Sequence, residues 1–130
     1  LLNAGHETTA NTVTNGIDAL LRFPGELARL RADPALVGGT VEETLRFESS
    51  VQLGNRKLTA DAEVAGVAMK KGDYVWLSIG AANRDPEIFI DPDRFDIARK
   101  PNRHLAFGGG IHACAGMSLG GFVGYPVTVG

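Results

Sequence analysis

The sequence predicts a mainly α-helical fold with a small β-sheet, and three observations support this. Apolar residues recur at helical spacing through residues 1–47, where prolines separate one helical stretch from the next. Short β-prone runs divided by turn signals follow, and the last of them is Tyr74 to Ile79. Residues 81–103 then combine prolines with many charges, which is typical of a long loop. Helices therefore come first, a small sheet second and an irregular loop third.

Three helices are expected before residue 48. The first covers residues 1–23 and has one apolar face, made of Val13, Ile17, Leu20 and Leu21. The second runs from Pro24 to Ala32, because proline is favoured in a first turn, and its inward residues are Leu27 and Leu30. The third covers residues 36–47 and repeats apolar residues every four positions, at Val37, Val41 and Leu45. Two glycines weaken its start, so a start at Thr40, with Glu43 completing a capping box, stays open.

The β-prone part contains two turn signals, Ala65-Gly66 and Lys71-Gly72, and we expect short strands between and after them. The loop that follows has two aromatic anchors, Phe89 and Phe95. An irregular stretch of this length is uncommon unless it is functional.

Composition excludes several classes of protein. The chain has 130 residues, enough for about one domain. Its net charge of -2 gives no electrostatic reason to expect nucleic acid or an anionic membrane surface as a partner. A single cysteine cannot form an internal disulfide, which favours a reducing compartment such as the cytoplasm. No apolar run approaches the roughly 20 residues of a membrane span. The polar, patterned start LLNAGHETTANT indicates that residue 1 lies inside an element, so a targeting segment would lie upstream.

The stretch FGGGIHACAG, residues 107–116, holds the single cysteine, Cys114. Its run of three glycines lets the backbone adopt positive φ and approach a flat, bulky ligand. A helix after Gly116 would place Cys114 before a helix N-terminus, which favours a thiolate, a soft metal ligand. Zinc is disfavoured, because no second Cys or His pair has zinc spacing. A nucleophilic cysteine and an inert cysteine in a turn stay open as alternatives.

The same stretch resembles the haem-binding loop of the cytochrome P450 family, whose pattern is Phe-Gly-x-Gly-x-His-x-Cys-x-Gly. The resemblance implies haem b as cofactor, with Cys114 as the thiolate ligand of the iron. It also implies that the cofactor is held by the other fixed positions, namely Phe107, Gly108, Gly110, His112 and Gly116. The implied fold is the C-terminal part of the P450 fold, with an oxygen-activation helix, a Glu-x-x-Arg helix, a small sheet, a proline-rich segment and the haem-thiolate loop.

Residues 4–9, AGHETT, can be interpreted first from their chemistry. A threonine hydroxyl inside a helix can donate to the carbonyl four residues earlier, so Thr8 would donate to Ala4. Gly5 leaves room for a small ligand close to the helix, and Glu7 adds an acid beside the hydroxyl. The stretch resembles the oxygen-activation segment of the family, which implies Glu7 and Thr8 as catalytic proton-relay residues and Ala4 and Gly5 as cofactor contacts. A polar helix whose threonines face solvent is the alternative.

Glu43 and Arg46 lie three positions apart, so they share a helix face and can form an ion pair. Most such pairs are exposed and contribute little. The spacing resembles the buried Glu-x-x-Arg pair of the family, which a second arginine joins from the loop before the haem segment. The resemblance assigns this structural role to Arg94, in the stretch PDRF. A local pair between Asp93 and Arg94 is the alternative.

Three further residues match positions that contact the haem propionates in the family: Arg56, His104 and His112. Arginine suits this role because a guanidinium pairs well with a carboxylate. Two alternatives stay open: Arg56, beside Lys57, as a surface charge, and His104 as the cap of a turn.

Residues 81–99, AANRDPEIFIDPDRFDIAR, resemble the soluble bacterial branch of the family. The resemblance implies a cytoplasmic monooxygenase that inserts one atom of O2 into a small organic substrate. Its electrons would come from NAD(P)H through a ferredoxin or a flavoprotein reductase. A peroxide-driven haem peroxygenase and a haem-binding sensor are alternatives, and the Glu7-Thr8 pair disfavours both. A haem-binding fragment without activity of its own is a further alternative.

The resemblance covers residues 1 to about 119. The family continues here with a helix, but residues 120–130 read GGFVGYPVTVG, and their glycines and proline do not suit a helix. We therefore expect residues 1–130 to form a partial P450 domain with an atypical tail at residues 120–130, encoded by an incomplete gene. Most segments that contact substrate would lie outside it. Within it, only residues near Ala4 and residues 51–55 could contact substrate, and Leu53 is the main candidate.

Overall fold

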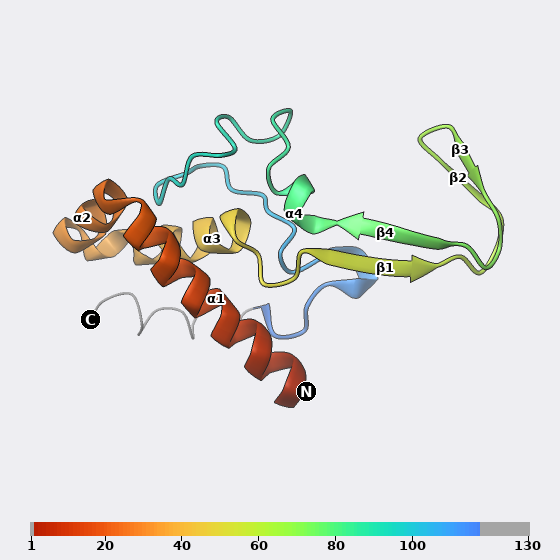
Figure 1. Cartoon of the computed structure of the whole chain (residues 1–130), viewed down its shortest axis with the longest axis horizontal. Helices are drawn as coiled ribbons and strands as arrows, with labels where there is room; N and C mark the ends of the chain where they lie inside the picture. The colour runs from red at the N-terminus through yellow and green to blue at the C-terminus, as the bar shows by residue number, and fades with distance from the viewer. Residues whose placement is uncertain (1, 118–130) are drawn as a thin grey trace.

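The computed structural model describes residues 2–117, with helices at one end and β-ribbons at the other (Figure 1). Three helices come first, as predicted: α1 (Leu2–Arg22), α2 (Pro24–Ala32) and α3 (Val37–Phe47). A 3-10 turn, η1 (Pro34–Leu36), leads into α3. Within the described range, no helix combines the length and the apolar content needed to cross a bilayer. The helix expected after Gly116 and the tail at residues 120–130 extend beyond Met117 and lie outside the described residues.

Helix α3 begins at Val37, so the alternative start at Thr40 with a capping box is wrong. The side chain of Asp33 accepts the N–H of Ala35 at 3.0 Å and caps η1, which runs directly into α3. Thr40 therefore lies inside the helix, where it is fully buried and its Oγ1 donates to the carbonyl of Leu36 at 2.9 Å. The carboxylate of Glu43 has other partners, which are described below.

The predicted single sheet is two separate antiparallel ribbons. The first pairs β1 (Leu53–Lys57) with β4 (Tyr74–Ser78), and the second pairs β2 (Ala62–Val64) with β3 (Val67–Met69). Ala65 and Gly66 join β2 to β3 with φ of 50° and 78°, the positive values that a tight hairpin turn requires. A short helix, α4 (Ile79–Ala82), follows β4 directly. The strand β1 was not expected from the sequence, and it carries Arg56 opposite Val75.

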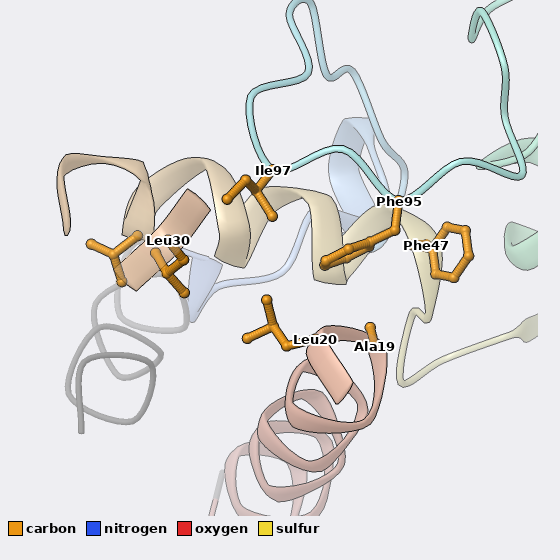
Figure 2. Packing of buried hydrophobic residues seen from close by; sticks show 7 residues of the cluster. Ala19, Leu20, Leu30, Phe47, Phe95 and Ile97 are labelled. Carbon is orange, nitrogen blue, oxygen red and sulfur yellow. The ribbon is translucent and has the colours of Figure 1, made fainter. Parts of the chain in front are cut away.

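The hydrophobic core lies where α1, α2, α3 and the long loop meet (Figure 2). It consists of Ala19, Leu20, Leu30, Val37, Phe47, Phe95 and Ile97. Three aromatic rings pack in its centre, with centroids 5.5 to 5.6 Å apart, namely Phe23, Phe47 and Phe95. Phe89 and Phe95 are 3% and 1% exposed, which confirms that they anchor the loop.

The apolar face of α1 differs from the prediction. Leu20 is buried, but Leu21 is 68% exposed, because Ala19 takes the second core position on this helix. Val13 and Ile17 line a cavity instead of the core. Helix α1 therefore has two apolar surfaces, one toward the core and one toward the cavity. The expected burial of Val37, Val41 and Leu45 on α3 is confirmed.

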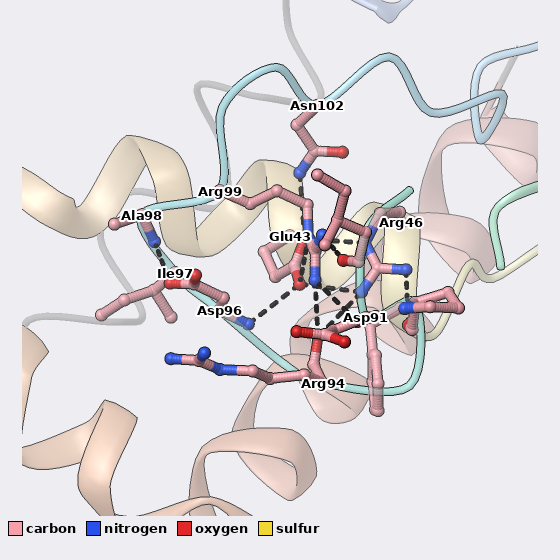
Figure 3. Close-up of polar contacts among 12 residues, drawn as sticks. Glu43, Arg46, Asp91, Arg94, Asp96, Ile97, Ala98, Arg99 and Asn102 are labelled. Carbon is pink, nitrogen blue, oxygen red and sulfur yellow. Dashed lines mark hydrogen bonds and ion pairs between the residues drawn. The ribbon is translucent and has the colours of Figure 1, made fainter. Parts of the chain in front are cut away.

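A buried ion-pair network attaches the long loop to α3 (Figure 3). Arg46 donates through Nε and Nη2 to the two carboxylate oxygens of Glu43, each at 2.8 Å, and both side chains are fully buried. A second guanidinium, that of Arg99, donates through Nε to both oxygens at 3.1 Å. Asn102 Nδ2 and the N–H of Asp96 also donate to this carboxylate, at 3.1 and 2.9 Å. Glu43 therefore joins α3 to the loop.

The second arginine of this network is Arg99, and the prediction of Arg94 was wrong. Arg94 is exposed and its side chain points away from Glu43 (Figure 3), while its carbonyl accepts from Arg46 and Arg99. Asp93, its alternative partner, pairs with Arg84 at 2.9 Å. Phe95 is turned into the core, so its neighbour Arg94 faces outward.

Candidate functional site

An apolar cavity of about 820 Å³ lies between α1, the β1–β4 ribbon and the cysteine loop, residues 107–116. Seven of the predicted site residues line it, and they come from three separate segments: Ala4, Thr8, Arg56, Phe107, Gly108, His112 and Cys114. Its volume is in the range of small-molecule and cofactor sites, about 300–1,000 Å³. Gly5, Glu7, Gly110 and Gly116 lie beside these residues in the chain but do not line the cavity, and neither does Leu53.

Helix α1 presents a hydroxyl to the cavity at Thr8. Its Oγ1 donates to the carbonyl of Ala4 at 2.7 Å, which is the bond that the sequence predicted. A Cβ built on Gly5 would meet no atom within 4 Å, so the glycine leaves open space beside the helix. The neighbouring Glu7 is exposed. The helix therefore combines an alcohol in the cavity wall with an acid that contacts solvent.

A cluster of hydroxyls that the sequence analysis missed holds α1 at the same point. Ser50 Oγ donates to the carbonyl of Thr8 at 2.8 Å, and Thr12 Oγ1 donates to the same oxygen at 2.8 Å. The two hydroxyls are 2.6 Å from each other. Asn15 Nδ2 adds a bond to the carbonyl of Glu48 at 2.9 Å. The segment after α3 is thus attached to the turn of α1 that carries Thr8.

The cysteine loop is shaped by its glycines and by one backbone bond. Gly108 and Gly110 have φ of 68° and 60°, whereas Gly109 is extended, so two of the three glycines take the positive φ that was expected. A Cβ on Gly108 would also lie only 3.2 Å from the carbonyl oxygen of His112. The loop contains a 3-10 turn, η2 (Gly110–His112), and closes where the N–H of Cys114 donates to the carbonyl of Phe107 at 2.9 Å. Cys114 is an exposed free thiol on the cavity wall.

Of the three residues predicted to contact the propionates, two line the cavity together with Cys114. Arg56 and His112 are exposed and line the cavity, so both can meet anionic groups of a ligand. His104, the third residue predicted to contact a propionate, does not line the cavity, and its Nε2 lies 3.0 Å from Glu42 Oε2 on α3. The hydrogen bond from His104 lowers the pKa of Glu42, although partial burial of the carboxyl opposes this.

This arrangement fits a large, mostly apolar ligand with anionic groups. The thiol can act as a soft ligand to a metal that such a molecule carries, while the arginine and the histidine can meet its anionic edge. A metal centre built from protein side chains alone is not supported, because residues 2–117 contain no group of three or more His, Cys, Asp or Glu that could hold an ion.

Comparison with known proteins gives a consistent result. The family model described as Cytochrome P450 matches residues 1–122 of the chain. The biotin biosynthesis cytochrome P450 of Bacillus subtilis (strain 168) is 51% identical over 116 residues, which are 89% of this chain and 29% of that protein. Cytochrome P450 107B1 of Saccharopolyspora erythraea is 53% identical over 120 residues, 92% of this chain and 30% of that protein.

A solved structure is similar over nearly the same range. The crystal structure of P450BioI in complex with hexadec-9Z-enoic acid ligated acyl carrier protein superposes with a TM-score of 0.91 and 47% sequence identity. The superposition covers 96% of this chain and 32% of that one. The chain therefore spans about 30% of the length of the relatives that it matches.

Proposed function

Because the chain belongs to the cytochrome P450 family, homologous to bacterial P450 enzymes, we propose that it forms the thiolate side of a haem monooxygenase. The proposed enzyme inserts one atom of O2 into a small organic substrate. The observation that supports this is the convergence of Thr8, Arg56 and Cys114, from three distant segments, on one apolar cavity. Since the matched relatives are about three times longer, we propose that residues 1–130 are part of a P450 domain, with residues 120–130 as a tail that departs from the family pattern.

The family implies haem, and the residues present fit this cofactor. Cys114 is a free thiol in the cavity wall and would be the thiolate ligand of the iron. Arg56 and His112 would bind the propionates, since both line the cavity and Arg suits a carboxylate. When bound, haem with a thiolate ligand supplies the activation of O2 and the cleavage of its O–O bond.

The loop residues would hold Cys114 in place. The carbonyl of Phe107 accepts the N–H of Cys114, so the position of the thiol follows the turn at residues 105–108. Gly108 and Gly110 allow the course of the loop through their positive φ. A Cβ on Gly116 would lie 3.8 Å from the sulfur, so the glycine keeps this position beside the thiol free. Ala4, on α1, lines the cavity and would keep this wall free of bulky side chains, and the neighbouring Gly5 leaves open space beside the helix.

Thr8 and Glu7 are proposed to deliver protons. The proton of Thr8 Oγ1 is held by the carbonyl of Ala4, which leaves the lone pairs of Oγ1 free to accept a hydrogen bond from water in the cavity. Glu7 is exposed and can take up protons from solvent. A well-placed acid-base group is typically worth about 10²–10⁴-fold in rate.

Electrons are proposed to come from NAD(P)H through a ferredoxin or a flavoprotein reductase, in the cytoplasm. The substrate is proposed only as a small organic molecule. One relative, P450BioI, is described in complex with acyl carrier protein carrying hexadec-9Z-enoic acid, so a fatty acid is a reasonable first probe.

The experiment compares Thr8→Ala with its neighbour Thr9→Ala in the protein encoded by the natural reading frame that contains this chain. A substrate panel that includes hexadec-9Z-enoic acid is screened first, and NAD(P)H consumed, peroxide released and product formed are measured with a substrate that is turned over. Thr8→Ala should keep consuming NAD(P)H while product falls and peroxide rises, and Thr9→Ala should change little. Full coupling in Thr8→Ala would remove Thr8 from the mechanism and favour a peroxygenase.

A further inference from the structure

Consecutive glutamates of α3 contact two different parts of the chain. Glu43 is fully buried and binds the loop arginine Arg99, as described above. Glu42, the next residue toward the N-terminus, is half exposed and contacts His104, just before the cysteine loop. Helix α3 thus holds both the long loop and the segment that leads into Cys114, through neighbouring carboxylates.

The ring of His104 is fixed on three sides. Its Nε2 lies 3.0 Å from Glu42 Oε2, and its Nδ1 accepts the N–H of Ala106 at 3.3 Å. Since Nδ1 accepts, the ring proton lies on Nε2 and is donated to the carboxylate. The ring also packs against Phe107, with centroids 6.0 Å apart, and only 5% of the His104 side chain is exposed.

A short series of contacts connects the His104 ring to the backbone of Cys114. His104 contacts Ala106 and Phe107, two residues of the turn that precedes the glycines. This turn is fixed at its start, where the N–H of Leu105 donates to Asn83 Oδ1 at 2.7 Å. At its end the carbonyl of Phe107 accepts the N–H of Cys114 at 2.9 Å. A shift of the His104 ring would therefore move the carbonyl that holds the backbone of Cys114.

From these contacts we propose that Glu42 and His104 are positioning residues for Cys114. The pair attaches the turn at residues 105–108 to α3 and thereby sets the position of the thiol relative to the cavity. His104 acts through the loop and not by touching a ligand, because it does not line the cavity. The proposal rests on the proposed thiolate role of Cys114.

The test uses the haem-loaded protein encoded by the natural reading frame that contains this chain. The variants are His104→Leu, His104→Gln and Glu42→Leu, with Glu63→Leu, an exposed glutamate on β2, as the matched control. The measured quantity is the ratio of the strongly red-shifted Soret band to the histidine-type band in the reduced, CO-bound protein. We expect this ratio to fall about 5- to 10-fold in His104→Leu and Glu42→Leu, the effect of one hydrogen bond to a half-exposed charge. His104→Gln should keep most of the ratio, since its Nε2 can still donate to Glu42.

The possible results distinguish a failure of the positioning role from a failure of the proposed thiolate function. A red-shifted band that is unchanged in His104→Leu and Glu42→Leu would overturn the positioning role and leave the proposed function intact. A histidine-type band in the unmutated protein would overturn both. If His104→Leu does not fold, hydrogen exchange in Glu42→Leu decides: faster exchange of the Cys114 amide with unchanged protection of α1 supports the role, and unchanged exchange at Cys114 overturns it.

Discussion

Replacement of Arg99 by methionine tests the ion-pair network that holds the long loop. Arg99 makes five hydrogen bonds, two to the Glu43 carboxylate and three to the carbonyls of Ile90, Asp91 and Arg94. Its side chain is 10% exposed, so water replaces few of these bonds in the folded protein. Arg99→Met should therefore lower the free energy of unfolding markedly, while Arg94→Met, at an exposed position, should hardly change it.

The magnitude follows from what remains around Glu43. After loss of Arg99 the carboxylate keeps the fork of Arg46 and the donors from Asn102 and Asp96, so its charge stays paired. The cost is then that of the lost charge-assisted hydrogen bonds, about 2–4 kcal/mol. Glu43→Gln should cost more, about 3–5 kcal/mol, because it leaves the fully buried Arg46 cation without its anion. An exposed substitution such as Arg94→Met typically stays within about 0.5 kcal/mol.

The assay is urea unfolding followed by far-UV circular dichroism, with the unmutated protein, Arg99→Met, Arg94→Met and Glu43→Gln measured in parallel. A lower midpoint with an unchanged slope would show lost stability of the folded state. Equal destabilisation by Arg99→Met and Arg94→Met, or a larger effect of Arg94→Met, would refute the assignment of Arg99 to the network.

Two further predictions concern pH and packing. His104 lowers the pKa of Glu42, so the pair adds stability above the pKa of an unfolded glutamate, about 4.3, and loses it as pH falls through the lowered folded pKa. The difference in urea midpoint between the unmutated protein and Glu42→Gln should thus be largest near neutral pH and shrink in acid, and a difference independent of pH would contradict this. Gly39→Ala should lower the free energy of unfolding by about 1–3 kcal/mol, because its Cβ would collide with the carbonyl oxygen of Ile97. In the same urea unfolding assay Gly25→Ala should be neutral or stabilising, because its Cβ would meet no atom within 4 Å, and equal destabilisation by the two variants would contradict this.

Contacts within one helical turn could be predicted from the sequence. The bond from Thr8 to Ala4 and the pair of Glu43 with Arg46 follow from spacings of four and three residues, which fix the neighbours on a helix. The three helices were predicted for the same reason, since the apolar period and the prolines are local signals.

Contacts between distant segments could not be predicted, because they depend on the course of the loops. Arg94 and Arg99 both lie in the long loop, and no local pattern indicates that Phe95 packs into the core while Arg99 reaches Glu43. Ser50 lies 42 residues from Thr8, and no local pattern indicates that its hydroxyl binds the carbonyl there. The family resemblance suggests a propionate contact for His104, but no local pattern indicates its partner Glu42, which is 62 residues away on α3.

A single absorption spectrum tests whether Cys114 provides the thiolate of a haem enzyme. The protein encoded by the natural reading frame that contains this chain is loaded with haem, reduced and saturated with CO, and its Soret band is compared with that of Cys114→His. If Cys114 is the ligand, the unmutated protein should show the strongly red-shifted band of thiolate ligation, and Cys114→His should lose it completely. A histidine-type band in the unmutated protein, or a red-shifted band that survives in Cys114→His, would contradict it.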